Sequence, residues 1–160
     1  MVGAEALSST RVDIDTSGHD TLPHMPTTSV HVAEHIARPA VEVYQYVSDP
    51  ANLAHWASGL GNGVEQVDGE WQLDTPGGRA TVEFAPQNPH GVLDHRITLP
   101  EGVVIEVPMR VLEHGPDDAE VVFTVRPLAG MSDEDLAQDV AVVTEDLQRL
   151  KAVLEGQPVS

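Results

Sequence analysis

Two polar side chains occupy positions that the sequence pattern turns toward an apolar interior. His95 lies in the alternating stretch 92–99, and Glu34 lies in the alternating stretch 30–36. Because successive side chains of a β-strand point to opposite faces, each of the two shares its face with apolar neighbours. An imidazole and a carboxylate are the groups that general acid–base catalysis uses to remove a proton next to a carbonyl. His95, with Glu34 as a second member, is therefore the candidate catalytic residue.

Each candidate also has a purely structural interpretation. His95 fits a core histidine whose ring bonds to a backbone carbonyl or to water, and Glu34 fits a strand-end carboxylate turned to solvent. Arg96 and Arg110 fall on the opposite, outward rows, where ion pairs across neighbouring strands are expected. His95 and Glu34 stand on strands far apart in the chain, so they need not be close to each other.

The eight histidines do not predict a metal site. His31 and His35 share a strand face but lie ~13 Å apart, too far to ligate one ion. No His-x-His, helical His-x-x-x-His or carboxylate cluster completes a ligand set. The glycine-rich stretch 59–63 has no P-loop lysine after it, and we interpret it as a flexible lid over a cavity.

The element that must position these residues is a long helix at the end of the chain, from Ser132 to Glu155. Asp135 stands three residues after Ser132, as in a capping box, and Gly156 with Pro158 ends the helix. Its apolar residues alternate at spacings of four and three, which places them on one stripe. They are Leu136, Val140, Val143, Leu147, Leu150 and Leu154.

The preceding part of the chain predicts a strand, two short helices and six further strands. The first strand covers 30–36, and helices follow from Pro39 and through Trp56. Short connections rich in Gly, Pro, Asn and Asp indicate an antiparallel meander, and hence an α+β domain. The six strands are expected at 64–67, 70–74, 79–84, 92–99, 103–113 and 119–126.

The inward rows of this sheet and the apolar stripe of the helix predict a ligand cavity between them. Its polar members are few, as cavities for apolar ligands require. The expected lining residues are Trp56, Trp71, Phe84, His95, Ile97, Ile105, Val107, Met109, Phe123, Met131, Val140, Val143 and Leu147.

Composition bounds the class of protein. The chain has no cysteine and a formal net charge of −18, from 26 acidic residues against 8 basic ones. Such a charge repels phosphate backbones, so we expect neither nucleic acid nor an anionic membrane as a partner. No apolar run approaches the ~18 residues of a membrane span, and the N-terminus lacks the features of a secretory signal. We therefore expect a cytoplasmic protein without a cofactor or a metal, whose oligomeric state is open.

The domain organisation follows from a change of pattern near Thr28. Residues 1–27 hold scattered acidic, Ser, Thr, Gly and Pro residues with no periodicity, which predicts a disordered acidic tail. Residues 28–157 carry all the predicted elements and form one domain.

Several stretches of this domain resemble a known superfamily. Residues 36–44 (IARPAVEVY), then 47–50 (VSDP) and Trp56, resemble the opening of START-related, Bet v 1-like proteins (SRPBCC), and most of all their polyketide cyclase/dehydratase-like branch. The stretches 91–95, 108–111 and 130–134 resemble later landmarks, so the resemblance covers about 28–156. It implies a helix-grip fold, in which a curved seven-stranded antiparallel sheet wraps around the C-terminal helix, often with a cavity between them.

Three functions are compatible with these observations. The favoured one is a soluble binding protein that holds a small, mostly apolar molecule between the sheet and the C-terminal helix. The second is a polyketide cyclase/dehydratase-type enzyme that uses His95, with Glu34, as acid or base. The third is an interaction domain whose core is filled by its own side chains.

Overall fold

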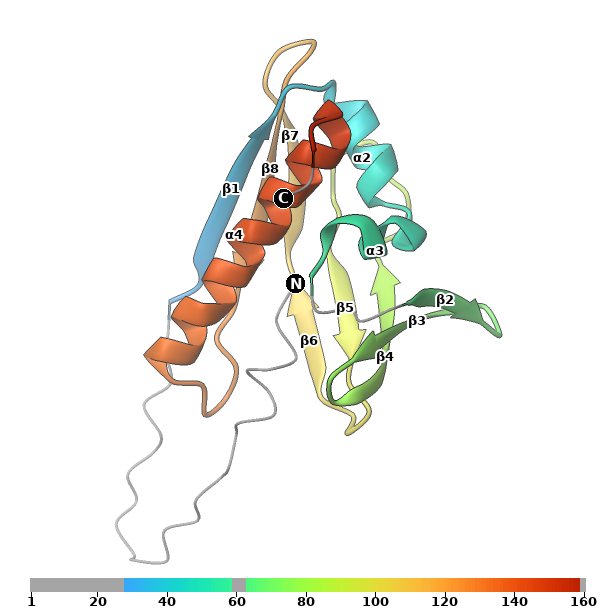
Figure 1. Ribbon diagram of the computed structural model, residues 1–160, viewed down its shortest axis with the longest axis vertical. Helices are drawn as coiled ribbons and strands as arrows, with labels where there is room; N and C mark the ends of the chain where they lie inside the picture. The colour runs from blue at the N-terminus through green and yellow to red at the C-terminus, as the bar shows by residue number, and fades with distance from the viewer. Residues whose placement is uncertain (1–27, 59–62, 159–160) are drawn as a thin grey trace, which may run out of the picture.

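The computed structural model describes residues 28–58 and 63–158, so the predicted tail 1–27 and most of the predicted lid 59–63 lie outside the described residues. The described chain contains eight strands, three α-helices and one 3₁₀ helix (Figure 1). The helices are α2 (Ala40–Val47), η1 (Pro50–Asn52), α3 (Leu53–Trp56) and α4 (Asp133–Glu155). The strands are β1 (Val30–Ile36), β2 (Val64–Val67), β3 (Glu70–Thr75), β4 (Gly78–Phe84), β5 (His95–Thr98), β6 (Val104–Val107), β7 (Met109–Glu113) and β8 (Ala119–Val125).

The predicted ends of the C-terminal helix are confirmed. The Ser132 hydroxyl accepts from the Asp135 N–H at 3.1 Å, and the Asp135 carboxylate accepts from the Ser132 N–H, which completes a capping box. The Ser132 hydroxyl also donates to the Asp135 carboxylate at 2.7 Å, and this bond together with the one from the Ser132 N–H lowers the pKa of Asp135. At the other end Gly156 has φ 69°, the left-handed conformation that commonly follows a helix.

The strands form two antiparallel sheets rather than the single seven-stranded sheet that we expected. One sheet has the order β1-β8-β7 and the other β2-β3-β4-β5-β6. The stretch 103–113, predicted as one strand, is interrupted at Pro108, which has no N–H to donate to a ladder. Before Pro108, β6 pairs with β5; after it, β7 pairs with β8. The α+β helix-grip architecture holds, with eight strands in two sheets.

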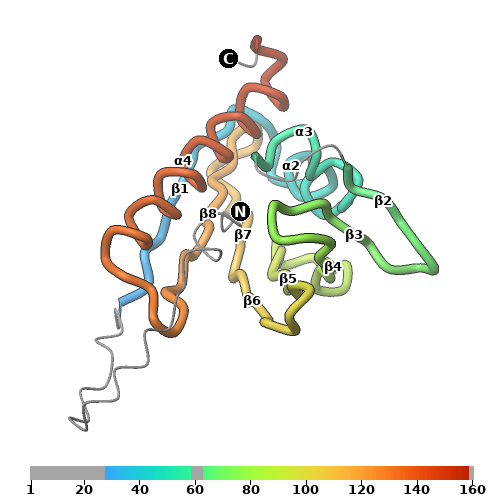
Figure 2. Tube along the Cα trace, turned by 60° about the horizontal axis from the view of Figure 1, so that its bottom comes forward, coloured from blue at the N-terminus to red at the C-terminus, as the bar shows by residue number. Residues whose placement is uncertain are grey.

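The long helix lies across the three-stranded sheet. Figures 1 and 2 show α4 running along β1 and β8, with α2 and α3 near its C-terminal half and β3 to β6 standing away from it. The main neighbours of α4 are β1, β8 and α3, and no strand of the five-stranded sheet is among them. The helix therefore packs along the three-stranded sheet and not along the strands of the five-stranded sheet.

The predicted alternation of buried and exposed side chains is confirmed along most strands. Every second residue of β8, from Ala119 to Val125, is buried. The same parity continues through the Pro108 interruption, since Ile105, Val107, Met109 and Val111 are all buried. One inward position that follows from the predicted strand 103–113 is wrong: Val103 shares the parity of Ile105 but is 46% exposed, because β6 begins one residue later.

Candidate functional site

His95 is a buried histidine at the start of β5. Its side chain is 5% exposed, and its ring stacks on Phe84 with the ring centroids 4.7 Å apart. Phe123, on β8, lies edge-on to the same ring at 6.1 Å. One ring nitrogen of His95 makes the backbone contact that the structural interpretation predicts: Nδ1 lies 3.0 Å from the Leu93 carbonyl oxygen.

This contact determines which ring nitrogen carries the proton. A carbonyl oxygen only accepts hydrogen bonds, so Nδ1 must donate and Nε2 is left with its lone pair. Burial lowers the pKa of His95 from 6.5 to about 4, because the charged ring loses its hydration, and the Leu93 bond offsets this only in part. At neutral pH the ring is neutral, and Nε2 is a hydrogen-bond acceptor and a weak base.

The burial of His95 predicts a loss of stability on acidification. Its pKa is lowered in the folded protein to about 4 from 6.5, so between these values the unfolded chain binds a proton that the folded chain does not. The contribution is complete above pH 6.5 and is lost as the pH falls toward 4. Between about pH 7 and pH 5 we expect the free energy of unfolding to fall by ~2 kcal/mol from this group, as measured by urea unfolding.

His95→Phe should flatten this part of the pH profile, because the ring volume stays and the titrating group is gone. His90, which is exposed, provides the control: His90→Phe should keep the wild-type slope. If the free energy of unfolding of His95→Phe kept the full dependence on pH, other groups would cause that dependence. The conclusion that His95 is buried and neutral would then be refuted.

Glu34 is ion-paired and does not lie at His95. Its carboxylate is 3.3 Å from the Lys151 Nζ on α4, and Lys151 also lies 3.7 Å from Glu155. Glu34 stands on β1 in the three-stranded sheet, whereas His95 stands on β5 in the other. The structure therefore does not bring the two candidate catalytic residues together, and Glu34 has a structural partner that sequence analysis did not supply.

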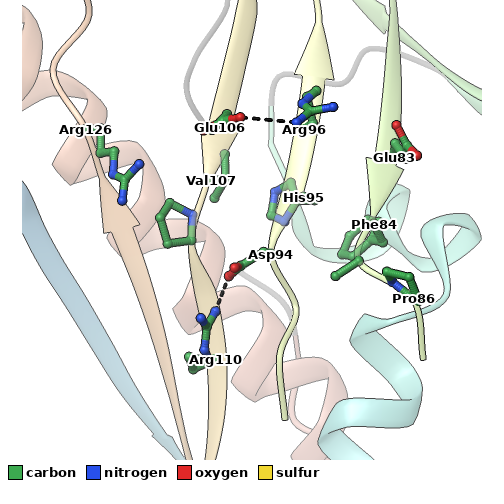
Figure 3. A pocket seen from close by; sticks show the side chains of 12 residues that line it. Glu83, Phe84, Pro86, Asp94, His95, Arg96, Glu106, Val107, Arg110 and Arg126 are labelled. Carbon is green, nitrogen blue, oxygen red and sulfur yellow. Dashed lines mark hydrogen bonds and ion pairs between the residues drawn. The ribbon is translucent and has the colours of Figure 1, made fainter. Parts of the chain in front are cut away.

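A pocket of about 440 Å³ adjoins His95 at the border of the two sheets (Figure 3). Figure 3 shows its side chains arriving from neighbouring strands, with His95 and Phe84 on one side and Arg126 on the other. The lining is strongly charged for a site next to an apolar core. It consists of Glu83, Phe84, Ala85, Pro86, Asp94, His95, Arg96, Glu106, Val107, Pro108, Arg110 and Arg126.

The outward arginines form the cross-strand ion pairs that their positions predicted. Arg96 on β5 lies 3.2 Å from Glu106, its register partner on β6. Arg110 pairs with Asp94, and the same carboxylate accepts from the Met109 N–H at 2.9 Å. Asp94 thereby gives the strand after Pro108 an acceptor at the point where β5 and β6 cease to pair.

Most of the residues predicted to line an inner cavity are buried. Trp71, Phe84 and Val140 are partly exposed, whereas the remaining ten are buried. The ten buried residues are Trp56, His95, Ile97, Ile105, Val107, Met109, Phe123, Met131, Val143 and Leu147. The pocket at His95 and a second pocket, lined by β6 and the end of β8, both lie among the described residues, and neither is lined by a residue of α4.

Two buried carboxylates on α4 were missed by sequence analysis. Asp139 is 1% exposed and Asp146 is fully buried. Asp146 accepts from the Ser58 N–H at 2.7 Å and lies 3.6 Å from Arg149, so it ties the chain after α3 to the long helix. The seven-residue spacing of the two acids, which places both on one side of the helix, was the available signal.

The two histidines of β1 have structural partners. His31 Nδ1 lies 2.9 Å from the Thr124 hydroxyl, and His35 Nε2 lies 3.1 Å from the Asp118 carboxylate. Over residues 28–58 and 63–158, no three His, Asp or Glu side chains come together as a metal site would require. Within the same ranges no helix has the length and apolar character needed to span a membrane.

The antiparallel sheets, the two short helices after β1 and the long C-terminal helix define a helix-grip fold. The chain belongs to the family described as polyketide cyclase/dehydrase and lipid transport, whose model matches residues 27–155. No curated protein matches the sequence.

Solved structures with the same fold include proteins of several kinds. DynU16, from the dynemicin biosynthetic locus, superposes with a TM-score of 0.62 at 23% identity, over 84% of this chain and 50% of DynU16. This chain therefore spans about half the length of DynU16. A truncated norcoclaurine synthase from Thalictrum flavum gives a TM-score of 0.60 at 12% identity, over 82% and 95% of the two chains. A START superfamily protein from Mycobacterium smegmatis gives 0.56 at 17% identity, over 80% and 97%. At these identities the likeness establishes the fold alone.

Proposed function

We propose that this domain binds a small, mostly apolar molecule between its sheets and α4. The observation that carries the proposal is the apolar character of the interior between the sheets and α4: of the buried residues that the structure describes, only His95, Asp139 and Asp146 are polar or charged. Leu73, Val82 and Ile97 of the five-stranded sheet belong to the same core cluster as Val143 and Leu147 of α4. These side chains are at most 4% exposed, so an apolar ligand that enters between them would gain affinity by removing its own apolar surface from water.

The indole N–H of Trp56, the last residue of α3, is a buried donor that supports one polar contact to such a ligand. Trp56 is 1% exposed, and within the described structure its indole N–H has no hydrogen-bond partner. A buried donor without an acceptor costs free energy, and native proteins seldom leave one unpaired. A ligand with a single carbonyl or hydroxyl oxygen would satisfy the Trp56 N–H, whereas a pure hydrocarbon would not.

The geometry favours binding over catalysis. A general base works best when its pKa is near the operating pH, and the lowered pKa of His95, about 4, makes it a weak proton acceptor. Glu34, its proposed partner, is held by Lys151 in the other sheet. The family description, which names both cyclases and lipid transport, accommodates a binding protein as well as an enzyme.

Titration with the neutral fluorescent probe N-phenyl-1-naphthylamine tests the proposal. We expect a rise in probe fluorescence on binding, and Val82→Phe should weaken the affinity about tenfold because the larger ring occupies the inner face. Val104→Phe makes the same change at a 46% exposed position on β6 and should leave the affinity unchanged. Circular dichroism spectra of both variants serve as the control that they are folded.

Two further results bear on the same proposal. Native mass spectrometry of freshly purified protein should reveal a co-purified small molecule of low polarity. His95→Phe should keep the probe affinity within about tenfold, since apolar burial does not need the imidazole. Failure of the probe to bind the wild type, or equal binding by Val82→Phe, would contradict an inner site. A cyclisation rate on a polyketone mimic that falls about a hundredfold in His95→Phe would instead support the enzyme.

A further inference from the structure

The interruption at Pro108 opens a seam between β6 and β8. The Thr124 N–H donates to the Pro108 carbonyl at 2.9 Å, and beyond this bond β6 pairs with β5 alone. A second pocket, of about 400 Å³, lies in the seam. It shares Glu106, Val107 and Arg126 with the pocket at His95, so the two pockets adjoin at these residues.

Arg126 is the unusual residue of this seam. Of the lysines and arginines in the described parts of the chain, Arg126 is the only one with neither an ion pair nor a hydrogen bond. It is an exposed cation in a chain with a formal net charge of −18. An unpaired arginine is therefore a scarce feature of this surface, and it stands where the two pockets meet.

Of the three acids that line the two pockets, two are paired with other arginines and the third lies across the pocket from Arg126. Glu106 is held by Arg96 at 3.2 Å, and Asp94 is held by Arg110. Glu83 lies on β4, on the far side of the pocket from Arg126 in Figure 3. The guanidinium of Arg126 thus keeps its five N–H donors for an incoming group, and their planar fork matches a carboxylate.

The seam offers an apolar surface directly beside this cation. Five of the eight residues that line the second pocket are apolar, and Val104, which is 46% exposed, is one of them. The others are Pro127 and Leu128, which are partly buried, and Ile105 and Val107, which are buried. A cation at one end and an apolar lining along the strand edge suit a molecule with an anionic head and an apolar body.

We propose that the seam between β6 and β8 binds a small amphiphilic organic anion, with its carboxylate on Arg126 and its apolar part along Val104 and Leu128. This site differs from the proposed inner site: Ile105 and Val107 border both, but the ligand contacts proposed here, Arg126, Val104 and Leu128, are not among the residues of the inner site. It would give the protein a second ligand class, organic acids, in addition to the neutral apolar molecules proposed for the interior.

Octanoate is the probe for this site, and 1-octanol is its uncharged counterpart. In a ¹⁵N-labelled sample of the full chain, octanoate should shift the amide signals of Val104–Val107 and Arg126. Arg126→Gln should weaken octanoate binding about tenfold or more, since a charge-assisted pair is lost, and Arg126→Lys should restore part of it. Arg79→Gln removes the same charge from an arginine that Glu65 and Asp74 already hold, and should leave octanoate binding unchanged.

The results that would overturn the seam site are distinct from those that bear on the inner site. The site is refuted if octanoate shifts no signals, if Arg126→Gln binds it like the wild type, or if the shifts fall on α4 instead. It is also refuted if 1-octanol shifts the same amides with equal affinity, because the carboxylate would then contribute nothing. Val82→Phe should leave octanoate binding intact, whereas Val104→Phe should weaken it, the reverse of their expected effects on the neutral probe.

Discussion

Gly91→Ala should lower the free energy of unfolding by ~3 kcal/mol or more. Gly91 has φ 68°, and a Cβ built there would lie 2.2 Å from the backbone oxygen of Val111. The close approach is required by the fold, because the Val111 N–H donates to the Gly91 carbonyl at 2.9 Å. A methyl group at Gly91 must therefore push β7 away from the loop before β5, in addition to adopting a conformation that L-residues disfavour.

The loop around Gly91 has little freedom to relax. The Asn88 side chain accepts from the His90 N–H at 3.0 Å and from the Val92 N–H at 3.1 Å, and it donates to the Val92 carbonyl at 3.0 Å. Chemical denaturation of the wild type and of Gly91→Ala measures the difference in their free energies of unfolding.

Gly102→Ala separates the clash from the backbone conformation. Gly102 has φ 85° and no atom within 4 Å of a built Cβ, so alanine there should cost only the conformational strain, ~1–2 kcal/mol. Equal losses at the two positions would mean that the contact between Gly91 and Val111 is not maintained in solution.

Sequence analysis predicted α4 and the faces of the strands because both are local properties. The capping box of Ser132 and Asp135 needs only three residues of separation, and the apolar stripe needs only the helical period. Strand parity is equally local, and it placed His95 and Ile97 on the buried face without any knowledge of their neighbours.

The division into two sheets was not predicted because it depends on partners far along the chain. Parity runs through Pro108 unbroken, so the stretch 103–113 has the pattern of one strand. Which strand pairs with each half is decided by β5 on one side and β8 on the other. The same holds for Glu34, whose inward parity was correct but whose partner, Lys151, stands on α4.

The candidate site was predicted in part for the same reason. Parity put Arg96 and Arg110 on the outward rows, and the structure confirms their ion pairs with Glu106 and Asp94. Arg126 has no ion pair or hydrogen bond within residues 28–58 and 63–158, and this follows from the departure of β6 from β8, which no local pattern encodes. Charge patterns along single strands therefore predict pairs more readily than they predict the cation that is left over.

Leu147→Ala should lower the free energy of unfolding by ~2–5 kcal/mol. Leu147 is 1% exposed in the middle of α4 and belongs to the core cluster that joins the helix to both sheets. Truncation removes buried methyl groups and leaves a cavity that the surrounding side chains fill only in part. Alanine is itself a good helix former, so the loss reports packing rather than helix propensity.

Leu112→Ala is the matched control for this prediction. Leu112 is 46% exposed on β7, and its truncation should change the free energy of unfolding by less than about 1 kcal/mol in the same urea titration. A loss below about 1 kcal/mol for Leu147→Ala would mean that α4 does not press on the core at its centre. The space at Leu147 would then belong to the proposed ligand site, and a neutral apolar probe should bind the variant more tightly than the wild type, because the cavity would be larger.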